Sequence, residues 1–91
     1  MITVYKYPVQ MQAEFTVELP RGAEFLSVQE QNGEPQMWFR VDTSRELAKQ
    51  VFSIVGTGRP IAPELSRLPH LGTFQVAGGS LVFHLFGGIY A

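Results

Sequence analysis

The stretch that decides the fold is Leu71-Gly-Thr-Phe-Gln-Val-Ala-Gly-Gly-Ser-Leu-Val-Phe-His-Leu-Phe-Gly-Gly-Ile-Tyr-Ala91, which contains no Asp, Glu, Lys or Arg. Two runs of strand-forming residues flank Gly78-Gly79, a dipeptide that readily adopts the positive φ angles of a tight hairpin turn. On one side of the hairpin, a two-residue loop pairs Phe74 with Phe83, Val76 with Leu81 and Gly72 with Leu85. On the other side it pairs Thr73 with His84 and Gln75 with Val82. The stretch therefore predicts a hairpin with one apolar face and one mixed face, and a slip of one residue would scramble this sorting.

Working outward from this hairpin, the rest of the chain also shows the period of β-strands. Apolar and polar residues alternate cleanly over 11–19, and strands are predicted as well at 2–7, 25–31, 36–42 and 51–55. Asn32-Gly33 is a strong hairpin signal, and a two-residue loop there places Val28 opposite Met37 and Leu26 opposite Phe39 on the core face.

Two short helical turns are also predicted. Thr43 and Glu46 have the spacing of a capping box, which indicates a helical turn that continues to about Lys49. A second turn is expected at Pro63, and Pro69 would end it. The predicted fold class is all-β: a single domain, residues 1–91, forming a small antiparallel sandwich or partly open barrel of about seven strands. A helix packed across a single sheet is the alternative.

The composition excludes several classes of function. The 91 residues are 45% hydrophobic and 16% charged with a net charge of −1, which is ordinary for a globular domain. The absence of cysteine excludes disulfides, thiol chemistry and a cysteine-based zinc site. The seven basic residues are scattered singly, so neither nucleic acid nor an anionic membrane is an expected partner. No signal-peptide pattern is visible, and we expect a cytoplasmic protein without metal or cofactor.

The reverse face of the hairpin around Asn32-Gly33 is the first candidate binding surface. By alternation it carries Phe25, Trp38 and Arg40, and aromatic residues and arginine dominate the energetics of protein interfaces. Arg40 could stack on Phe25. The alternative is that this side packs against a second layer of the same domain.

Two further candidates involve the polar residues of the second half. Gly56-Thr57-Gly58-Arg59 could form an anion-binding loop, with Thr57 and Arg59 as ligand-contacting residues, or it could simply be a turn that ends a strand. His84 could act as a base or a ligand, or be a hydrogen-bonded structural histidine. His70 and His84 are the only histidines, and they fall short of a metal site or a catalytic triad.

The end of the chain predicts self-association. Phe86, Ile89 and Tyr90 lie beyond or at the edge of the predicted hairpin, and a small domain seldom leaves that much apolar surface in water. We therefore expect a homodimer that buries these three side chains across a two-fold axis. In the alternative, this tail folds back on its own sheet.

Four motifs span nearly the whole chain: Leu19-Pro20-x-Gly22-Ala23-x-x-Leu26-Ser27-Val28-Gln29, Gly56-Thr57-Gly58-x-Pro60-Ile61, Gly72-Thr73-Phe74 and Leu81-Val82-Phe83-His84. Together with Trp38 and Val41-Asp42, they resemble a family of short uncharacterised proteins from tailed phages and prophages. The resemblance brings no catalytic residues with it. It implies a small phage accessory protein that is made inside the infected bacterium.

Three functional hypotheses follow from these observations. The first is a non-catalytic binding protein that inhibits or sequesters a host defence factor, in the manner of an anti-CRISPR or other anti-defence protein. Its partner would be a host protein or a small signalling molecule. The second is a structural or assembly component of the phage particle. The third is a small hydrolase that uses His84 with Asp42 or Thr57, although no complete set of nucleophile, base and orienting group can be identified.

Overall fold

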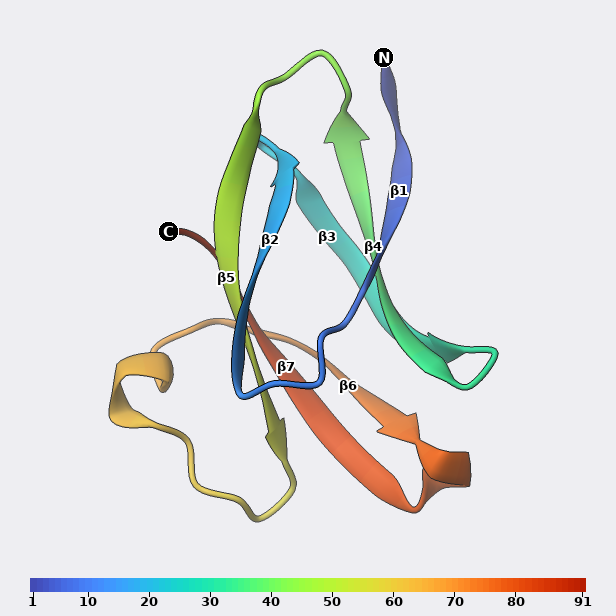
Figure 1. Cartoon of the computed structure of the whole chain (residues 1–91), viewed down its shortest axis with the longest axis vertical. Coiled ribbons are helices and arrows are strands. Elements are labelled where there is room, and N and C mark those ends of the chain that lie inside the picture. The colour runs from blue at the N-terminus through green and yellow to red at the C-terminus, as the bar shows by residue number, and fades with distance from the viewer.

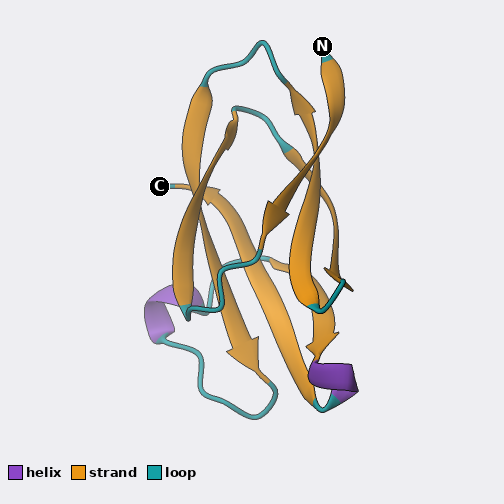
Figure 2. Cartoon of the chain, turned by 45° about the vertical axis from the view of Figure 1, so that its right-hand side comes forward, coloured by secondary structure: helices purple, strands orange, loops and turns teal.

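The computed structural model describes residues 1–91 and confirms the predicted all-β fold. It has seven strands and two isolated 3-10 turns. The strands are β1 (Ile2–Pro8), β2 (Glu14–Pro20), β3 (Glu24–Gln31), β4 (Glu34–Asp42), β5 (Leu47–Gly56), β6 (His70–Val76) and β7 (Leu81–Tyr90), and the turns are η1 (Pro63–Leu65) and η2 (Ala77–Gly79). Figure 2 shows the two turns on opposite sides of the molecule.

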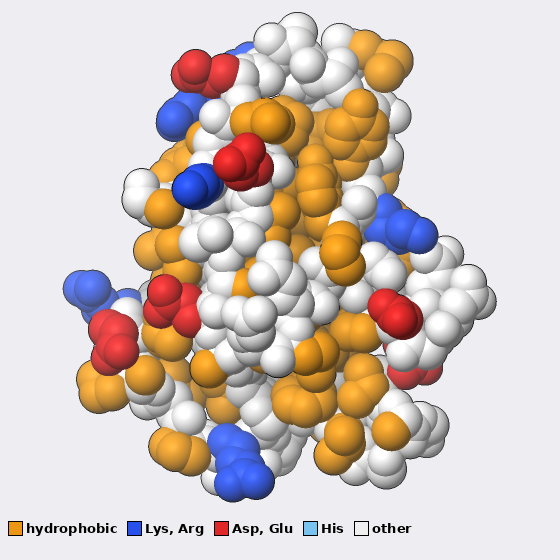
Figure 3. Space-filling model, in the orientation of Figure 1, with side chains coloured by type: hydrophobic (Ala, Val, Ile, Leu, Met, Phe, Trp, Pro, Cys, Tyr) orange, Lys and Arg blue, Asp and Glu red, His pale blue; other side chains and the backbone are white.

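The strands form two antiparallel sheets that pack face to face as a sandwich. One sheet has three strands in the order β1-β4-β3, and the other has four in the order β2-β5-β7-β6 (Figure 1). The sheets adjoin where β3 passes β6. On the opposite side, β1 and β2 are free edges, and apolar side chains are visible in the opening between them (Figure 3). The sandwich is therefore open along one side and does not close into a barrel.

Aromatic side chains from both sheets form the centre of the core. Phe39 of β4 and Phe52 of β5 are almost fully buried, and their rings meet edge to face with centroids 6.0 Å apart. Burial of one such side chain stabilises the fold by about 1.5–3 kcal/mol. At the junction of the sheets, a Cβ atom on Gly72 would lie 2.8 Å from Cγ1 of Val28, so glycine permits the close approach of β6 to β3.

The hairpin of β6 and β7 has the predicted register. All five predicted pairs are present, including Phe74 opposite Phe83 and Thr73 opposite His84. The connection is longer than the two glycines, because β6 ends at Val76 and the four residues up to Ser80 form the turn. Lengthening the loop by one residue on each side leaves the pairing unchanged, so the predicted apolar face still points into the core.

The hairpin of β3 and β4 is confirmed near its turn and differs further away. Its loop is Asn32-Gly33, both with positive φ angles, and Val28 lies opposite Met37 as predicted. A β-bulge between Phe25 and Ser27 then adds one residue to β3. The predicted pairing of Leu26 with Phe39 is therefore wrong: Phe25 pairs with Phe39 and packs on it edge to face at 5.6 Å, while Leu26 is exposed.

The helical turn predicted after Thr43 is not formed. Asp42 instead organises a turn, because its Oδ1 accepts hydrogen bonds from the Ser44 backbone N–H at 3.0 Å and the Ser44 hydroxyl at 2.7 Å. β5 begins directly afterwards at Leu47, where it pairs with Pro20 of β2. Strand pairing thus overrides a local capping signal. The second predicted turn is present as η1, with Pro63 at its start.

Candidate functional site

The outward side of the three-stranded sheet carries several exposed apolar side chains. Met37 and Phe39 point into the core, so the alternation of β4 places Trp38 and Arg40 outside. We use the name Trp38 face for the outward residues of this sheet: Ile2, Val4, Lys6, Glu24, Leu26, Ser27, Trp38 and Arg40.

Nothing in the chain covers the Trp38 face. Ile2 is 70% exposed, Val4 51% and Leu26 44%, whereas Trp38 is only partly exposed. By register Trp38 lies opposite Lys6 and Ser27, and Val4 lies one row further along, opposite Arg40. No connecting segment crosses the outer side of β1, β4 and β3 in Figures 1 and 2. Exposed apolar side chains on the same sheet face as a tryptophan and an arginine form the kind of surface that proteins use to bind one another.

The charged groups of the Trp38 face already have hydrogen-bond partners within the chain. The Arg40 guanidinium donates to Oε2 of Glu24 at 2.6 Å, and Nζ of Lys6 donates to Oε1 of Gln31 at 2.7 Å. The hydrogen bond and positive charge of Arg40 hold the pKa of the Glu24 carboxyl below its ordinary value, and Glu24 raises the pKa of Arg40. Arg40 therefore pairs with Glu24 rather than stacking on Phe25.

The sequence placed Trp38 and Arg40 correctly and missed the apolar residues beside them. Phe25 is absent from this face because the bulge turns it toward the core, and Leu26 takes its place outside. Ile2 and Val4 reach the face because β1 pairs with β4, so that Val4 lies opposite Arg40. The sequence predicted a strand that contains Ile2 and Val4, but it did not indicate that this strand pairs with β4.

A chain of hydrogen bonds links the two histidines on the outer side of the four-stranded sheet. Nδ1 of His84 lies 2.9 Å from the Thr73 hydroxyl, and its Nε2 lies 2.8 Å from the Thr57 hydroxyl. Nε2 of His70 lies 3.4 Å from the same Thr73 hydroxyl. Both ring nitrogens of His84 are thus satisfied, as expected for a structural histidine. His70 joins because a bulge at Leu71 shifts the register of β6.

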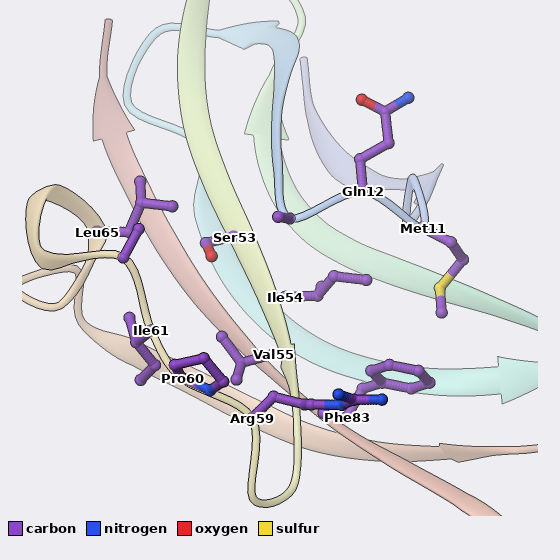
Figure 4. A pocket seen from close by; sticks show the side chains of 13 residues that line it. Met11, Gln12, Ser53, Ile54, Val55, Arg59, Pro60, Ile61, Leu65 and Phe83 are labelled. Carbon is purple, nitrogen blue, oxygen red and sulfur yellow. The ribbon is translucent and has the colours of Figure 1, made fainter.

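The glycine-rich turn does not present the row of free N–H groups that an anion nest needs. The Thr57 N–H donates to the Val82 carbonyl at 3.2 Å, and the Arg59 N–H donates to the Gly56 carbonyl at 3.0 Å. Gly58 supplies the positive φ angle that reverses the chain. The segment is therefore a turn that ends β5. The Arg59 side chain extends from it beside an open pocket and forms no ion pair with a carboxylate (Figure 4).

The three residues expected at a dimer interface all belong to β7. Phe86 packs edge to face on the His70 ring, with centroids 5.3 Å apart, and Ile89 lies opposite Val51 of β5. The Tyr90 hydroxyl accepts a hydrogen bond from the Gly22 N–H at 2.7 Å. The tail folds back on its own sheet, as the alternative interpretation expected. Ile89 and Tyr90 remain partly exposed, and self-association stays a prediction.

The structure contains neither a cluster of metal ligands nor a helix that could span a membrane. No three side chains of histidine, aspartate or glutamate come together as ligands for a metal ion. No helix has the length and apolar character required to cross a lipid bilayer.

The fold is a small antiparallel β-sandwich in which the outer side of the three-stranded sheet is open to solvent. The chain belongs to the family described as Domain of unknown function (DUF7352), whose match covers residues 1–90. Comparison with curated proteins and with solved structures found no match. The family is thus an uncharacterised one, and its description gives no function for these residues.

Proposed function

We propose that the protein acts by non-catalytic binding and that the Trp38 face is its binding surface. The observation that carries this proposal is the set of exposed apolar side chains, Ile2, Val4 and Leu26, on the same sheet face as the partly exposed Trp38. The Glu24–Arg40 pair lies in the same row as Val4, between Trp38 and Ile2, so the face combines apolar side chains with an ion pair.

The resemblance to short proteins of tailed phages and prophages supports a partner in the infected bacterium. We take the protein as a phage accessory protein that inhibits or sequesters a host factor, with a defence protein as the target. An apolar patch on a flat sheet suits a protein partner better than a small signalling molecule, because small molecules bind mostly in concave pockets.

The test begins with a pull-down from infected cells, after which the captured protein is purified and its dissociation constant measured by calorimetry. Trp38→Ala should weaken binding about thirtyfold, which corresponds to ~2 kcal/mol, while the melting temperature changes by only a few degrees. Val4→Ala should weaken binding as well. Leu81→Ala is the matched control, because Leu81 is as exposed as Val4 but lies on the other sheet.

Two outcomes would contradict the proposal. If Trp38→Ala unfolds the protein, the tryptophan is part of the core and not a binding residue. If Leu81→Ala weakens binding as much as Val4→Ala, the partner does not use the Trp38 face. Recovery of the protein from purified virions would instead support the second hypothesis, a structural or assembly component of the particle.

One observation favours a second candidate function, a small hydrolase. The Thr57 hydroxyl, the His84 ring and the Thr73 hydroxyl follow one another as a nucleophile, base and orienting group would. The orienting group is a neutral hydroxyl, which cannot stabilise an imidazolium as a carboxylate does. Asp42 lies in the other sheet, bonded to Ser44. Hydrolysis of p-nitrophenyl acetate that His84→Ala abolishes in a folded protein would establish this function.

A further inference from the structure

The inner strand β5 has a free edge at its C-terminal end. β2 begins at Glu14, opposite Ser53, so the last three residues of β5, Ile54–Gly56, have no strand beside them on that edge. On the other edge they pair with β7, where Ile54 lies opposite Leu85. The Gly56 carbonyl already accepts the Arg59 N–H at 3.0 Å. The remaining backbone groups on this edge lack a strand partner, and an edge of this kind can accept an added strand.

An apolar pocket lies along this free edge. Its volume is about 410 Å³, within the range of small ligand sites. Residues Met11–Ala13 form one wall and the segment from Arg59 to Leu65 forms the other. Figure 4 shows Met11 and Ile54 on one side, with Pro60, Ile61 and Leu65 on the other. Eight of the thirteen lining residues are hydrophobic, so the pocket suits an apolar side chain.

Arg59 is the one charged residue among those that line the pocket. It forms no ion pair, whereas Arg21 and Arg40 each have a glutamate partner within 3.5 Å. No carboxylate lines the pocket to compete for it. The Arg59 N–H donates a hydrogen bond to the Gly56 carbonyl, and this bond fixes the position of the Arg59 backbone from which the side chain extends. An unpaired guanidinium at the rim of an apolar pocket complements a carboxylate.

We propose that this pocket binds the C-terminal end of an extended peptide. The peptide lies along Ile54–Gly56 as a short additional strand, its last side chain enters the apolar pocket, and its terminal carboxylate meets Arg59. Three residues of free edge span about 10 Å, which accommodates two to three residues of the peptide. This site is separate from the Trp38 face and does not depend on the function proposed for it.

The experiment uses the full chain and four probes followed by ¹H–¹⁵N NMR titration. The first probe is the peptide acetyl-Ala-Thr-Val-Leu with a free carboxylate, and the second is the same peptide as the C-terminal amide. The third carries an N-methyl group on its last peptide nitrogen, and the fourth is hexanoate. We expect the free acid to shift the amide signals of Ile54–Gly56 and Arg59, with the amide and the N-methylated peptide at least about tenfold weaker.

Arg59→Gln should weaken binding of the free acid about tenfold, and Arg67→Gln is the matched control. Arg67 belongs to the same connecting segment, is exposed, and does not line the pocket. Equal binding of acid and amide, an unchanged affinity in Arg59→Gln, or no binding of the free acid at millimolar concentration would overturn the proposal. Hexanoate binding as tightly as the peptide would overturn the assignment of a strand, since the pocket would then recognise any small apolar acid.

Discussion

The outer sides of the two sheets differ in what the chain does with them. On the four-stranded sheet, Ser53 points away from the core and is still only 1% exposed, because the long connection between β5 and β6 passes over it, with Leu65 beside it (Figure 4). Leu68 of the same connection is buried although it lies outside the main core cluster. On the three-stranded sheet, Ile2 and Val4 are open to solvent. The chain thus covers part of the outer side of one sheet by itself and leaves the outer side of the other sheet open.

The largest effect on stability should follow from adding a methyl group to β7 in the four-stranded sheet. In Gly87→Ala, the new Cβ would lie 2.5 Å from the Val51 carbonyl oxygen, at a φ of +135°. Steric overlap and backbone strain should together cost at least ~3 kcal/mol of the free energy of unfolding, measured by urea denaturation. Gly33→Ala in the three-stranded sheet is the control, because its φ is also positive but its surroundings are open. It should cost about 1 kcal/mol. Equal costs would contradict this difference in packing.

The second prediction compares two leucines. Leu68→Ala should destabilise the protein by about 2 kcal/mol, since it truncates a residue of the connection between β5 and β6 that is only 8% exposed. Leu26→Ala, on the Trp38 face, should change stability by less than ~0.5 kcal/mol. Chemical denaturation of both variants gives the two values. A cost for Leu26→Ala as large as that of Leu68→Ala would show that the Trp38 face is buried in the folded protein, for example by self-association.

The third prediction concerns two tyrosines of similar exposure. Tyr90→Phe removes the acceptor of the Gly22 N–H hydrogen bond and should cost about 1 kcal/mol, while the contact of its ring with the Arg21 guanidinium, at 4.8 Å, remains. Tyr5→Phe at the free edge removes no hydrogen bond of the structure and should be neutral. Thermal unfolding measures both. If Tyr90→Phe is also neutral, the bond does not hold the end of β7 to the turn.

A monomeric mass by light scattering would refute the predicted homodimer.

The smallest effect is a pH dependence confined to the three-stranded sheet. Arg40 lowers the pKa of Glu24 from its ordinary 4.5, and hydrogen bonds from Ser44 lower that of Asp42 from its ordinary 3.8. A carboxyl whose pKa is lower in the folded state stabilises the fold above its unfolded pKa, and this stability is lost as the pH falls through the folded value.

The difference in melting temperature between the wild type and Glu24→Gln should therefore be small at neutral pH and vanish as the pH falls through the lowered pKa of Glu24. Glu64→Gln is the control, because Glu64 forms no ion pair. A difference that persists or grows in acid would contradict the proposed role of the Glu24 carboxylate.

Turn chemistry explains which parts of the fold could be predicted. Positive φ angles at Asn32-Gly33 and Gly78-Gly79 determine the register of the residues nearest each turn, and these pairs are correct. The bulges at Leu26 and Leu71 could not be predicted, because they depend on how Phe25 and Leu71 pack against a core assembled from distant strands. The order of the strands in the sheets could not be predicted for the same reason, because it also depends on contacts between distant strands.

The candidate sites show the same limit. The sequence placed His84 opposite Thr73 because both belong to one hairpin, whereas Thr57 reaches His84 only through the pairing of β5 with β7. Trp38 was identified from the alternation of a single strand, while its apolar neighbours Ile2 and Val4 come from a strand more than thirty residues away in the sequence. The pocket beside Arg59 exists because β2 is shorter than β5, a mismatch that no local pattern indicates.

The position of β7 between β5 and β6 has a consequence for the order in which the chain folds. During synthesis, β3 and β4 emerge consecutively and can pair at once. β5 then has only β2 available, and β6 has no strand of its own sheet to join until β7 follows. The four-stranded sheet therefore forms late and by contacts distant in sequence, a topology associated with slow folding. Until β7 is inserted, the edges of β5 and β6 stay open, and chaperones or other nascent chains have their best opportunity to bind.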